Sequence, residues 1–442
     1  MDEPKPDVKS IRRHWKVLCQ DIGERVAGSA KERRALRYVA GEFEKLGLAN
    51  VQLEPFEFDN CAFGDFGGQA TVRGRKRKLM VRPCEYSTST PKGGVEGDLI
   101  FLDHACRADY GGPELQGKIG MFMGAPMPNP EWIECMTNSG LAAAILIDHR
   151  YYTRWPMLLG FPEMWASRVT MPIFSIPYEQ AWKLVQAGKG VRVKLWVKAR
   201  RMRSKSGNAI GDLPGVDSKL KKELIYVSGH VDTVRGSVGG SDNASGTVQA
   251  MELARMLRQT PLKRTVRFVG YGVEERLSVG SYRHYQNRSK NGMARAVFGY
   301  NGDSCSTVMG WNKLHISGPP ALTRLAKKVG ADLGYPAEYV EAISPYSDQF
   351  PLNMLDVPTI WVYRPCMVSG NWFFHSQYDR LNVVSADVMA NQVRFASELL
   401  RRIGNADKLP FPKALPNRIR KEVEDAVRQF HGIEISLRKK AK

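Results

Sequence analysis

The stretch from residue 222 to residue 272 decides the fold, because it alternates two kinds of pattern. KELIYVSGH (222–230) and RTVRFVGYG (264–272) are short apolar runs, and NASGTVQAMELARMLRQ (243–259) between them has apolar residues at helical spacing. Short apolar runs separated by an amphipathic helix are typical of parallel strands joined by a crossover helix. We therefore expect a parallel sheet with a helix packed on it.

The same rhythm continues toward the end of the chain. RAVFGYN (295–301) and VPTIWVYR (357–364) are further strand candidates, and helices are expected at 321–334 and 385–404. The predicted fold class is α/β, with a mostly parallel central sheet and helices on both faces.

The first half of the chain has a different pattern of apolar residues, which indicates a second domain. Short apolar runs such as GDLIFLD (97–103) and AAAILID (142–148) lie between turns, which predicts a strand-rich unit, and the polar stretch 201–219 is expected to be a linker. We expect a basic C-terminal tail that forms a frayed amphipathic end rather than a docking element. The predicted division is a helical part at 1–60, an insert at 61–205, a main domain at 206–405 and the tail at 406–442.

Composition excludes several classes of protein. The chain has 442 residues, of which 43% are hydrophobic and 25% charged. No apolar run reaches the roughly 18–20 residues that a membrane span needs, and we expect no membrane partner. The seven cysteines form no CxxC pair, which argues against a disulfide framework and a thiolate metal site. With no secretory pattern at the N-terminus, the expected location is the cytoplasm, or outside the cell if a leader has been trimmed.

The charge of the chain is strongly positive. The formal net charge is +20, with basic clusters at 73–78, 198–205 and 437–442. These clusters lack the interleaved aromatic residues of a nucleic-acid reader, so we expect solvated surface and no nucleic-acid partner. An acidic substrate remains open. The oligomeric state and the role of the tail are left open as well.

Metal-binding residue types follow the predicted strands. Because loops beyond the carboxyl ends of parallel strands meet in one crevice, these side chains should converge. A single Asp in a glycine-rich loop is by itself more typical of a turn or a helix cap, but the convergence favours a metal site. Nitrogen and oxygen ligands without thiolate suit zinc or another borderline divalent ion. The candidates are His230, Asp232, Asp242, Glu274, Glu275, Asp303 and His375.

Several motifs together resemble, in order and spacing, a known family. GHVDTV, GGSDNASGTVQAMELARML, GYGVEERLSVGSYRHY, YNGDS, SDQFPLNMLDVPTI and FHSQYDRLNVVS are similar to the motifs of co-catalytic di-zinc exopeptidases, which include bacterial leucyl aminopeptidase, aminopeptidase Y and glutamate carboxypeptidase. The resemblance covers about residues 12–404. GKIGMFMGAP and NSGLAAAILIDH within it resemble the protease-associated domain that many members insert.

The resemblance implies a role for each candidate and two zinc ions per chain. His230 and His375 would each bind one zinc, Asp242 would bridge both, and Glu275 and Asp303 would complete the two sites. Asp232 would orient His230 through its other ring nitrogen. Glu274 would be the general base. A cis peptide bond between Asp242 and Asn243 is also implied.

Two departures from the family pattern concern the walls of the site. Leu277 stands where the family usually has Gly, which puts the local turn in doubt. Phe374 stands where some carboxypeptidase-like members have Tyr, so Tyr346 becomes the candidate for binding the oxyanion, with plain packing as its alternative. Trp372 and Phe374 beside His375 would favour a hydrophobic substrate side chain, or else pack the core.

The function expected from the resemblance is a zinc-dependent aminopeptidase acting on peptide substrates. A metallocarboxypeptidase or a dipeptidase of the same fold is the nearest alternative. A receptor-like relative that only binds partners is the alternative from another class, and the complete ligand set argues against it. The residues leave open which end of the peptide is trimmed, which side chain is preferred and which metal is physiological.

Overall fold

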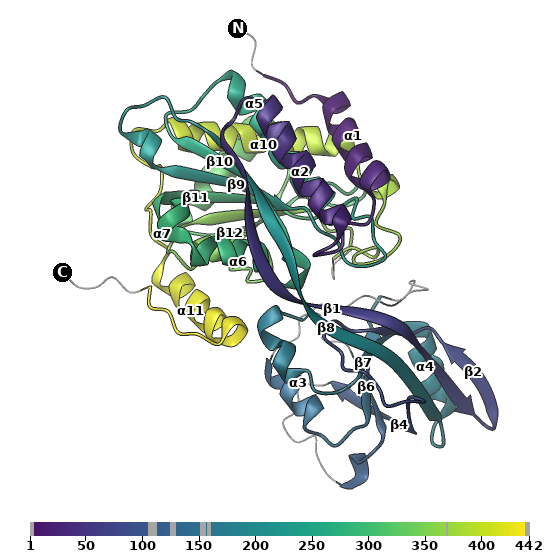
Figure 1. The fold of residues 1–442 in the computed structure, drawn as a ribbon. Coiled ribbons are helices and arrows are strands. Elements are labelled where there is room, and N and C mark those ends of the chain that lie inside the picture. The colour runs from purple at the N-terminus through teal and green to yellow at the C-terminus, as the bar shows by residue number, and fades with distance from the viewer. Residues whose placement is uncertain are drawn as a thin grey trace. The chain divides into compact units, whose positions relative to one another are not determined.

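The computed structural model describes residues 4–104, 113–123, 130–150, 156, 161–367 and 370–437 (Figure 1). Residues 124–126 of the quoted GKIGMFMGAP motif and the basic end at 438–442 lie outside them. Two compact units make up the chain. Unit 1 is Met1–Phe56, Lys205–Asn371 and Tyr378–Lys442, and unit 2 is Glu57–Ser204 and Trp372–Gln377. Within the described residues, no helix combines the length and the apolar character needed to cross a membrane.

Four neighbouring parallel strands form the centre of the sheet in unit 1. Their order is β14 (Thr359–Tyr363), β11 (Ala296–Gly302), β9 (Leu224–His230) and β10 (Thr265–Tyr271). Every residue of β9, β10 and β11 is buried, as is typical of strands covered on both faces. These are the strands predicted from the sequence, and the expectation of a mostly parallel sheet is confirmed.

Antiparallel and short strands complete the sheet on both sides. β12 (Lys313–Ser317) pairs antiparallel with β14, and β13 (Glu338–Val340) pairs parallel with β12. On the other side, the end of β8 (Arg192–Leu213) pairs antiparallel with β10. β12 and β13 were not predicted, because short strands with partly exposed residues do not form a clear apolar run.

Helices cover both faces of this sheet, as predicted. α1, α2, α5 and α10 lie together over one face, with α8 packed against α10, and α6 lies on the other face (Figure 1). The short helix α9 contacts β11 and β14. The bounds of these helices are α1 Val8–Lys16, α2 Ala30–Lys45, α5 Ala244–Gln259, α6 Val279–Gln286, α8 Pro320–Leu333, α9 Phe350–Asn353 and α10 Ala386–Asn405.

Shorter helical segments connect the main elements. A π-helical segment follows α1 at Val17–Ile22, and α7 spans Arg288–Asn291. The 3-10 turns are Pro113–Leu115, Glu163–Arg168, Leu220–Lys222, Glu274–Arg276, Met293–Arg295 and Leu381–Val383.

The predicted linker at 201–219 is wrong for most of its length. Residues up to Leu213 continue β8, a strand of 22 residues, which also pairs with β1 (Ala49–Val72), a strand of 24 residues. The side chains at 200–203 are exposed, whereas those at 206–213 are buried. The exposed basic part lacks the alternation of apolar and polar residues that predicts a strand, and glycines interrupt the buried part.

Unit 2 has its own sheet and its own hydrophobic core. Beyond β8 the strand order is β4, β5, β6, β7 and β3, and the hairpin strand β2 pairs with β1. Its core cluster includes Ile119, Ile145, Phe174 and Val193. The likeness of this unit to a protease-associated domain stays a prediction. The bounds are β2 Arg75–Leu79, β3 Arg82–Pro83, β4 Val95–His104, β5 Ile119–Met123, β6 Ala143–Asp148, β7 Ile173–Pro177, α3 Pro130–Thr137 and α4 Tyr178–Ala187.

The C-terminal helix α11 (Asn417–His431) is packed rather than frayed, contrary to the expectation. Ile419, Val423 and Val427 are buried, and the ring of Phe430 meets the ring of Tyr346 edge to face at 5.2 Å. The apolar residues recur at helical spacing, so one face of the helix is buried while its basic face remains exposed.

Candidate metal centre

The strand ends of unit 1 bring the predicted ligands together. His230 is the last residue of β9, and Asp303 directly follows β11. The Nε2 atom of His230 lies 3.2 Å from Asp242 Oδ1, 3.5 Å from Glu274 Oε2 and 3.5 Å from Asp303 Oδ1. All four side chains are buried. Residues far apart in the sequence thus form one cluster at the carboxyl ends of the parallel strands.

Among the described residues, two sets of three side chains have the arrangement that a metal ion needs. One set is His230, Glu274 and Asp303, and the other is His230, Asp242 and Glu275, and the ligand atoms within each set lie within 4.8 Å of one another. One imidazole nitrogen and several carboxylate oxygens are donors that suit zinc and similar divalent ions.

The state of His230 shows that a cation fits this cluster. Its ring is buried, and no described residue makes a hydrogen bond to Nε2. Burial alone would lower the pKa of His230, but the carboxylates of Glu274 and Asp303 raise it well above its ordinary value. The cluster therefore attracts positive charge at the position of Nε2, and a divalent metal would supply that charge.

Glu274 is suited to hold and release a proton. Burial raises the pKa of its carboxyl group well above the ordinary value, and the charge of Asp303 adds to this effect while His230 opposes it. The hydroxyl of Ser278 donates a hydrogen bond to Oε1 at 3.3 Å. A carboxylate whose pKa is raised in a charged, buried cluster is a typical acid–base group.

Asp232 holds the two neighbouring glutamates in place. Its Oδ1 accepts a hydrogen bond from the backbone N–H of Glu274 at 2.9 Å, and its Oδ2 accepts one from Glu275 at 3.2 Å. Its carboxylate also lies 3.6 Å from His230 Nδ1, and its backbone carbonyl lies 3.3 Å from the same nitrogen. A single residue thus orients the imidazole and both glutamates.

The turn that carries these glutamates has an unusual backbone. Val273, Leu277 and Ser278 have φ values of 60°, 65° and 55°, in the left-handed region. Glycine adopts this conformation without steric cost, which explains why the family pattern has Gly at the place of Leu277. The turn is present in this chain with Leu277 in the left-handed conformation.

The loop that carries Asp242 has the predicted cis peptide bond between Asp242 and Asn243. The side chain of Asn243 accepts a hydrogen bond from Gly246 N at 2.7 Å and begins α5 as its N-cap. A Cβ atom at Gly246 would lie 1.8 Å from the carbonyl oxygen of Gly302, so only glycine fits there. This close packing sets the start of α5 against the end of β11.

Asp379 supports Asp242 and was not among the predicted site residues. Its carboxylate accepts hydrogen bonds from the backbone N–H groups of Ser241 at 2.7 Å and Asp242 at 2.8 Å. Burial and the nearby charge of Asp242 raise the pKa of Asp379 to about 8. It lies within the quoted motif FHSQYDRLNVVS, but the motif alone does not show that its partners are backbone amides.

We expect Asp379→Asn to weaken metal binding by about 10–100-fold, because the loop that presents Asp242 loses one of its two acceptors. Calorimetric titration of the metal-free protein with Zn²⁺ would measure the change. The matched control is Asp217→Asn, since Asp217 also accepts two backbone N–H groups, from Lys219 and Leu220, at the surface. Equal zinc affinity in the two variants would contradict this role.

A chain of neutral hydrogen bonds orients Asp303. Ser228 Oγ donates to Asn301 Oδ1 at 2.7 Å, Asn301 Nδ2 donates to Ser347 Oγ at 2.9 Å, and Ser347 Oγ donates to Asp303 Oδ2 at 2.6 Å. The adjacent Asp348 is buried, and burial raises its pKa to about 7. These residues lie in or beside quoted motifs, but sequence reasoning gave them no role.

Arg25 is a further supporting residue that the sequence did not single out. Its side chain is completely buried and donates hydrogen bonds to the carbonyl oxygens of Val231 at 2.7 Å, Val238 at 2.8 Å and Gly239 at 3.3 Å. It therefore fixes the path of the loop between His230 and Asp242.

His375 lies in the segment of unit 2 that spans Trp372–Gln377, and it belongs to neither ligand set found among the described residues. Its φ is 50°, and the ring of Phe374 stacks on its ring at 3.7 Å. The buried side chain of Arg150 pairs with Asp148 at 2.6 Å and donates to the carbonyl oxygens of Trp372, at 3.3 Å, and Phe374. The role of His375 as a ligand stays a prediction.

If His375 binds metal, Arg150→Ala should loosen its segment and weaken one of two bound metals by about 10–100-fold. Metal content per chain, measured after dialysis against a weak chelator, would show this loss. The matched control is Arg201→Ala, because Arg201 also donates to two carbonyl oxygens of unit 2, those of Tyr86 and Val169. Full metal content in the Arg150 variant would contradict the idea that Arg150 positions a ligand.

The predicted substrate-binding residues have different surroundings. Trp372 is 41% exposed and Phe374 is partly buried, both in unit 2, whereas Tyr346 of unit 1 packs against Phe430. Burial raises the pKa of Tyr346. The contact with Phe430 supports the packing alternative for Tyr346, and the substrate roles of all three remain predictions.

The part of the chain that carries the cluster is also the part that is similar to a known protein family. Residues 208–400, which contain the cluster, match the profile of peptidase family M28. Aminopeptidase YwaD of Bacillus subtilis is 26% identical over 296 residues, which are 67% of this chain and 61% of that protein. Carboxypeptidase Q of Bos taurus is 24% identical over 288 residues, or 62% of this chain and 60% of that protein. The chain thus spans about three fifths of each of these relatives.

Solved structures show the same fold over nearly the whole chain. A zinc aminopeptidase from Bacillus subtilis superposes with a TM-score of 0.75 at 20% identity, covering 95% of this chain and 100% of that one. An aminopeptidase from Aneurinibacillus sp. strain AM-1 superposes with a TM-score of 0.74 at 20% identity, covering 92% and 96%. The predicted fold class is confirmed.

Proposed function

We propose that this chain is a metal-dependent exopeptidase that removes residues from the amino terminus of peptides. The observation that carries the proposal is the buried cluster of His230 with Asp242, Glu274 and Asp303 at the carboxyl ends of the parallel strands. The family match over residues 208–400 supports the reaction class.

In this proposal the chain holds two zinc ions. Asp242 would serve both ions, His230 and His375 would each bind one, and Glu275 and Asp303 would complete the two sites. The ring of His230 is buried, and no described residue makes a hydrogen bond to its Nε2 atom. This supports the assignment of His230 as a metal ligand. Glu275 also accepts a hydrogen bond from the backbone N–H of Val234 at 3.1 Å, which orients its carboxylate within the cluster.

The chemistry that a bound metal pair supplies is polarisation of the scissile carbonyl and activation of water. Glu274 would take a proton from the attacking water and give it to the leaving amine, which its raised pKa favours. Asp232 keeps the Glu274 backbone in register through the 2.9 Å hydrogen bond. Trp372 and Phe374 favour a hydrophobic side chain of the substrate.

Carboxypeptidase action is the second candidate function. It is favoured by the 24% identity to carboxypeptidase Q of Bos taurus. An aminopeptidase binds the free α-amine with acidic or carbonyl groups, whereas a carboxypeptidase needs Arg or Lys for the terminal carboxylate. The two candidates share the same metal cluster and differ only in which end of the peptide the site accepts.

The test is digestion of a peptide library by the zinc-loaded protein, with mass spectrometry of the products over time. We expect successive loss of amino-terminal residues, with hydrophobic residues removed fastest. Successive loss of carboxyl-terminal residues would replace the first candidate by the second. A protein that binds no zinc and leaves every peptide intact would contradict both and favour a binding role.

A further inference from the structure

The hairpin of β1 and β2 in unit 2 has one open edge. Gly68–Val72 of β1 pairs antiparallel with Arg75–Leu79 of β2, and within the described residues β2 pairs with no other strand. The outer edge of β2 therefore offers backbone N–H and C=O groups to an added strand. Exposed basic residues often protect such an edge from aggregation, so the open edge alone does not indicate a binding site.

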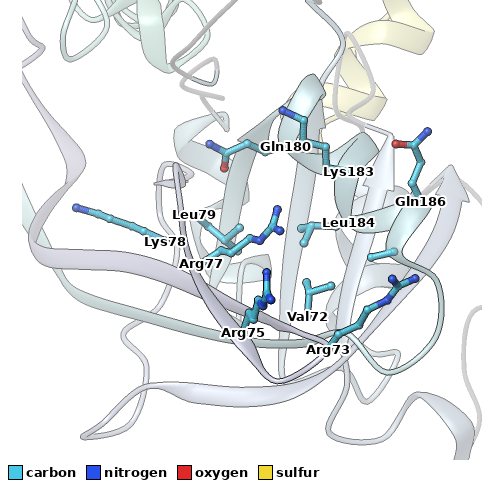
Figure 2. Close-up of a pocket in the computed structure, with 11 residues that line it drawn as sticks. Val72, Arg73, Arg75, Arg77, Lys78, Leu79, Gln180, Lys183, Leu184 and Gln186 are labelled. Carbon is cyan, nitrogen blue, oxygen red and sulfur yellow. The ribbon is translucent and has the colours of Figure 1, made fainter.

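A cavity of about 800 Å³ lies between this hairpin and α4 (Figure 2). Four residues of β2 line the cavity, namely Arg75, Arg77, Lys78 and Leu79, whereas Lys76 does not. Figure 2 shows Arg75 and Arg77 projecting from β2 toward the side on which Gln180 and Lys183 of α4 lie. The basic residues of the hairpin are exposed and lie at the edge of this cavity.

The lining combines an apolar part with arginines that have no ionic partner among the described residues. Val72, Leu79, Leu184 and Ala187 supply the apolar part. Lys183 pairs with Glu179 at 2.6 Å, but no described carboxylate pairs with Arg73, Arg75, Arg77 or Lys78. Elsewhere in unit 2, exposed arginines do have partners, as in the pairs Arg192–Glu96 and Arg203–Asp59. No described carboxylate therefore compensates the charge of these four side chains.

We propose that an extended acidic peptide segment binds here by adding a strand to the free edge of β2. Residues directly opposite each other on one face of paired strands are in contact, so carboxylates at alternate positions of the segment would face Arg75 and Arg77. Within the described residues, no aromatic side chain lines the cavity, which disfavours single-stranded nucleic acid as the occupant.

This site is independent of the proposed hydrolysis, and the experiment is designed to keep the two apart. The probe is a short fluorescent peptide with Glu at every second position and Val or Thr between, blocked at both ends so that an exopeptidase cannot trim it. Binding to the full chain is measured by fluorescence anisotropy at low ionic strength. A peptide of the same composition, with its glutamates placed next to one another, tests whether the alternation matters.

We expect Arg75→Ala with Arg77→Ala to weaken binding about tenfold, as the loss of two exposed charge-assisted contacts implies. The matched control, Lys76→Ala with Lys189→Ala, removes the same charge from exposed residues that do not line the cavity and should bind within about twofold of the unchanged protein. The permuted peptide should bind several-fold more weakly. Hydrogen exchange at the backbone N–H groups of 75–79 should slow when the alternating peptide is bound.

Each opposite result would overturn the proposal. Equal weakening in the control pair would show attraction by net charge only. Equal binding of the permuted peptide, or unchanged hydrogen exchange in β2, would rule out the added strand. A single-stranded oligonucleotide that displaces the peptide at lower concentration would assign the site to nucleic acid instead.

Discussion

Glu274→Gln should leave zinc bound while kcat falls by roughly 10² to 10⁴-fold. Glutamine keeps the size of the side chain and its capacity to accept the 3.3 Å hydrogen bond from Ser278, but it cannot take a proton from water. Burial raises the pKa of Glu274, which suits the proposed role of this carboxyl group in proton transfer. Elemental analysis of the dialysed variant and steady-state kinetics on a peptide substrate would provide the two measurements.

The comparison variant is Glu275→Gln, which changes the adjacent residue in the same turn. Because Glu275 is proposed to bind metal, its substitution should lower zinc content together with activity. If Glu274→Gln retains normal turnover, Glu274 is not the general base. If zinc is lost only when Glu274 is changed, the roles of the two glutamates are exchanged.

Asp242→Asn should remove both metals and lower activity by about 10³-fold or more, since several kcal/mol of charge stabilisation at the substrate would disappear. In the proposed arrangement Asp242 would contribute to both metal sites, whereas Asp303 or Glu275 would serve one. Asp303→Asn is therefore the matched control and should lose only the more weakly held ion.

Calorimetric titration of the two metal-free variants with Zn²⁺ would measure the number of metal sites and their affinities. The Asp242 variant should show no tight site, and the Asp303 variant should keep one. One remaining tight site in the Asp242 variant would mean that Asp242 serves a single metal and does not bridge.

The central strands and the long helices could be predicted because their signal is local. β9, β10, β11 and β14 are short apolar runs, and α5 and α10 have apolar residues at helical spacing. β1 and β8 could not be predicted at their full length, because much of their middle part is exposed and carries polar residues. In such strands, pairing with a neighbouring strand replaces the burial that produces an apolar pattern.

The candidate ligands of unit 1 could also be predicted, because topology places the ends of parallel strands together. The supporting residues could not. These supporting side chains bind backbone carbonyl or amide groups of distant segments, as Arg25, Arg150 and Asp379 do. Because nearly every residue has such backbone groups, the sequence does not indicate which of them a side chain will bind. Their role is visible only when the segments that they join are seen together.

The left-handed turn around Glu274 and Glu275 has a consequence for how this chain can evolve. A residue other than glycine in this conformation costs about 1–2 kcal/mol, and Val273, Leu277 and Ser278 all adopt it. The left-handed conformation of this turn therefore lowers the free energy of unfolding of the protein. Substitution of Leu277 by glycine would remove this cost at position 277 and give a more stable protein. Exchange of Leu277 for most other L-residues leaves the left-handed strain in place, so the route to relieving it at this position is narrow even though Leu277 is not proposed to bind metal.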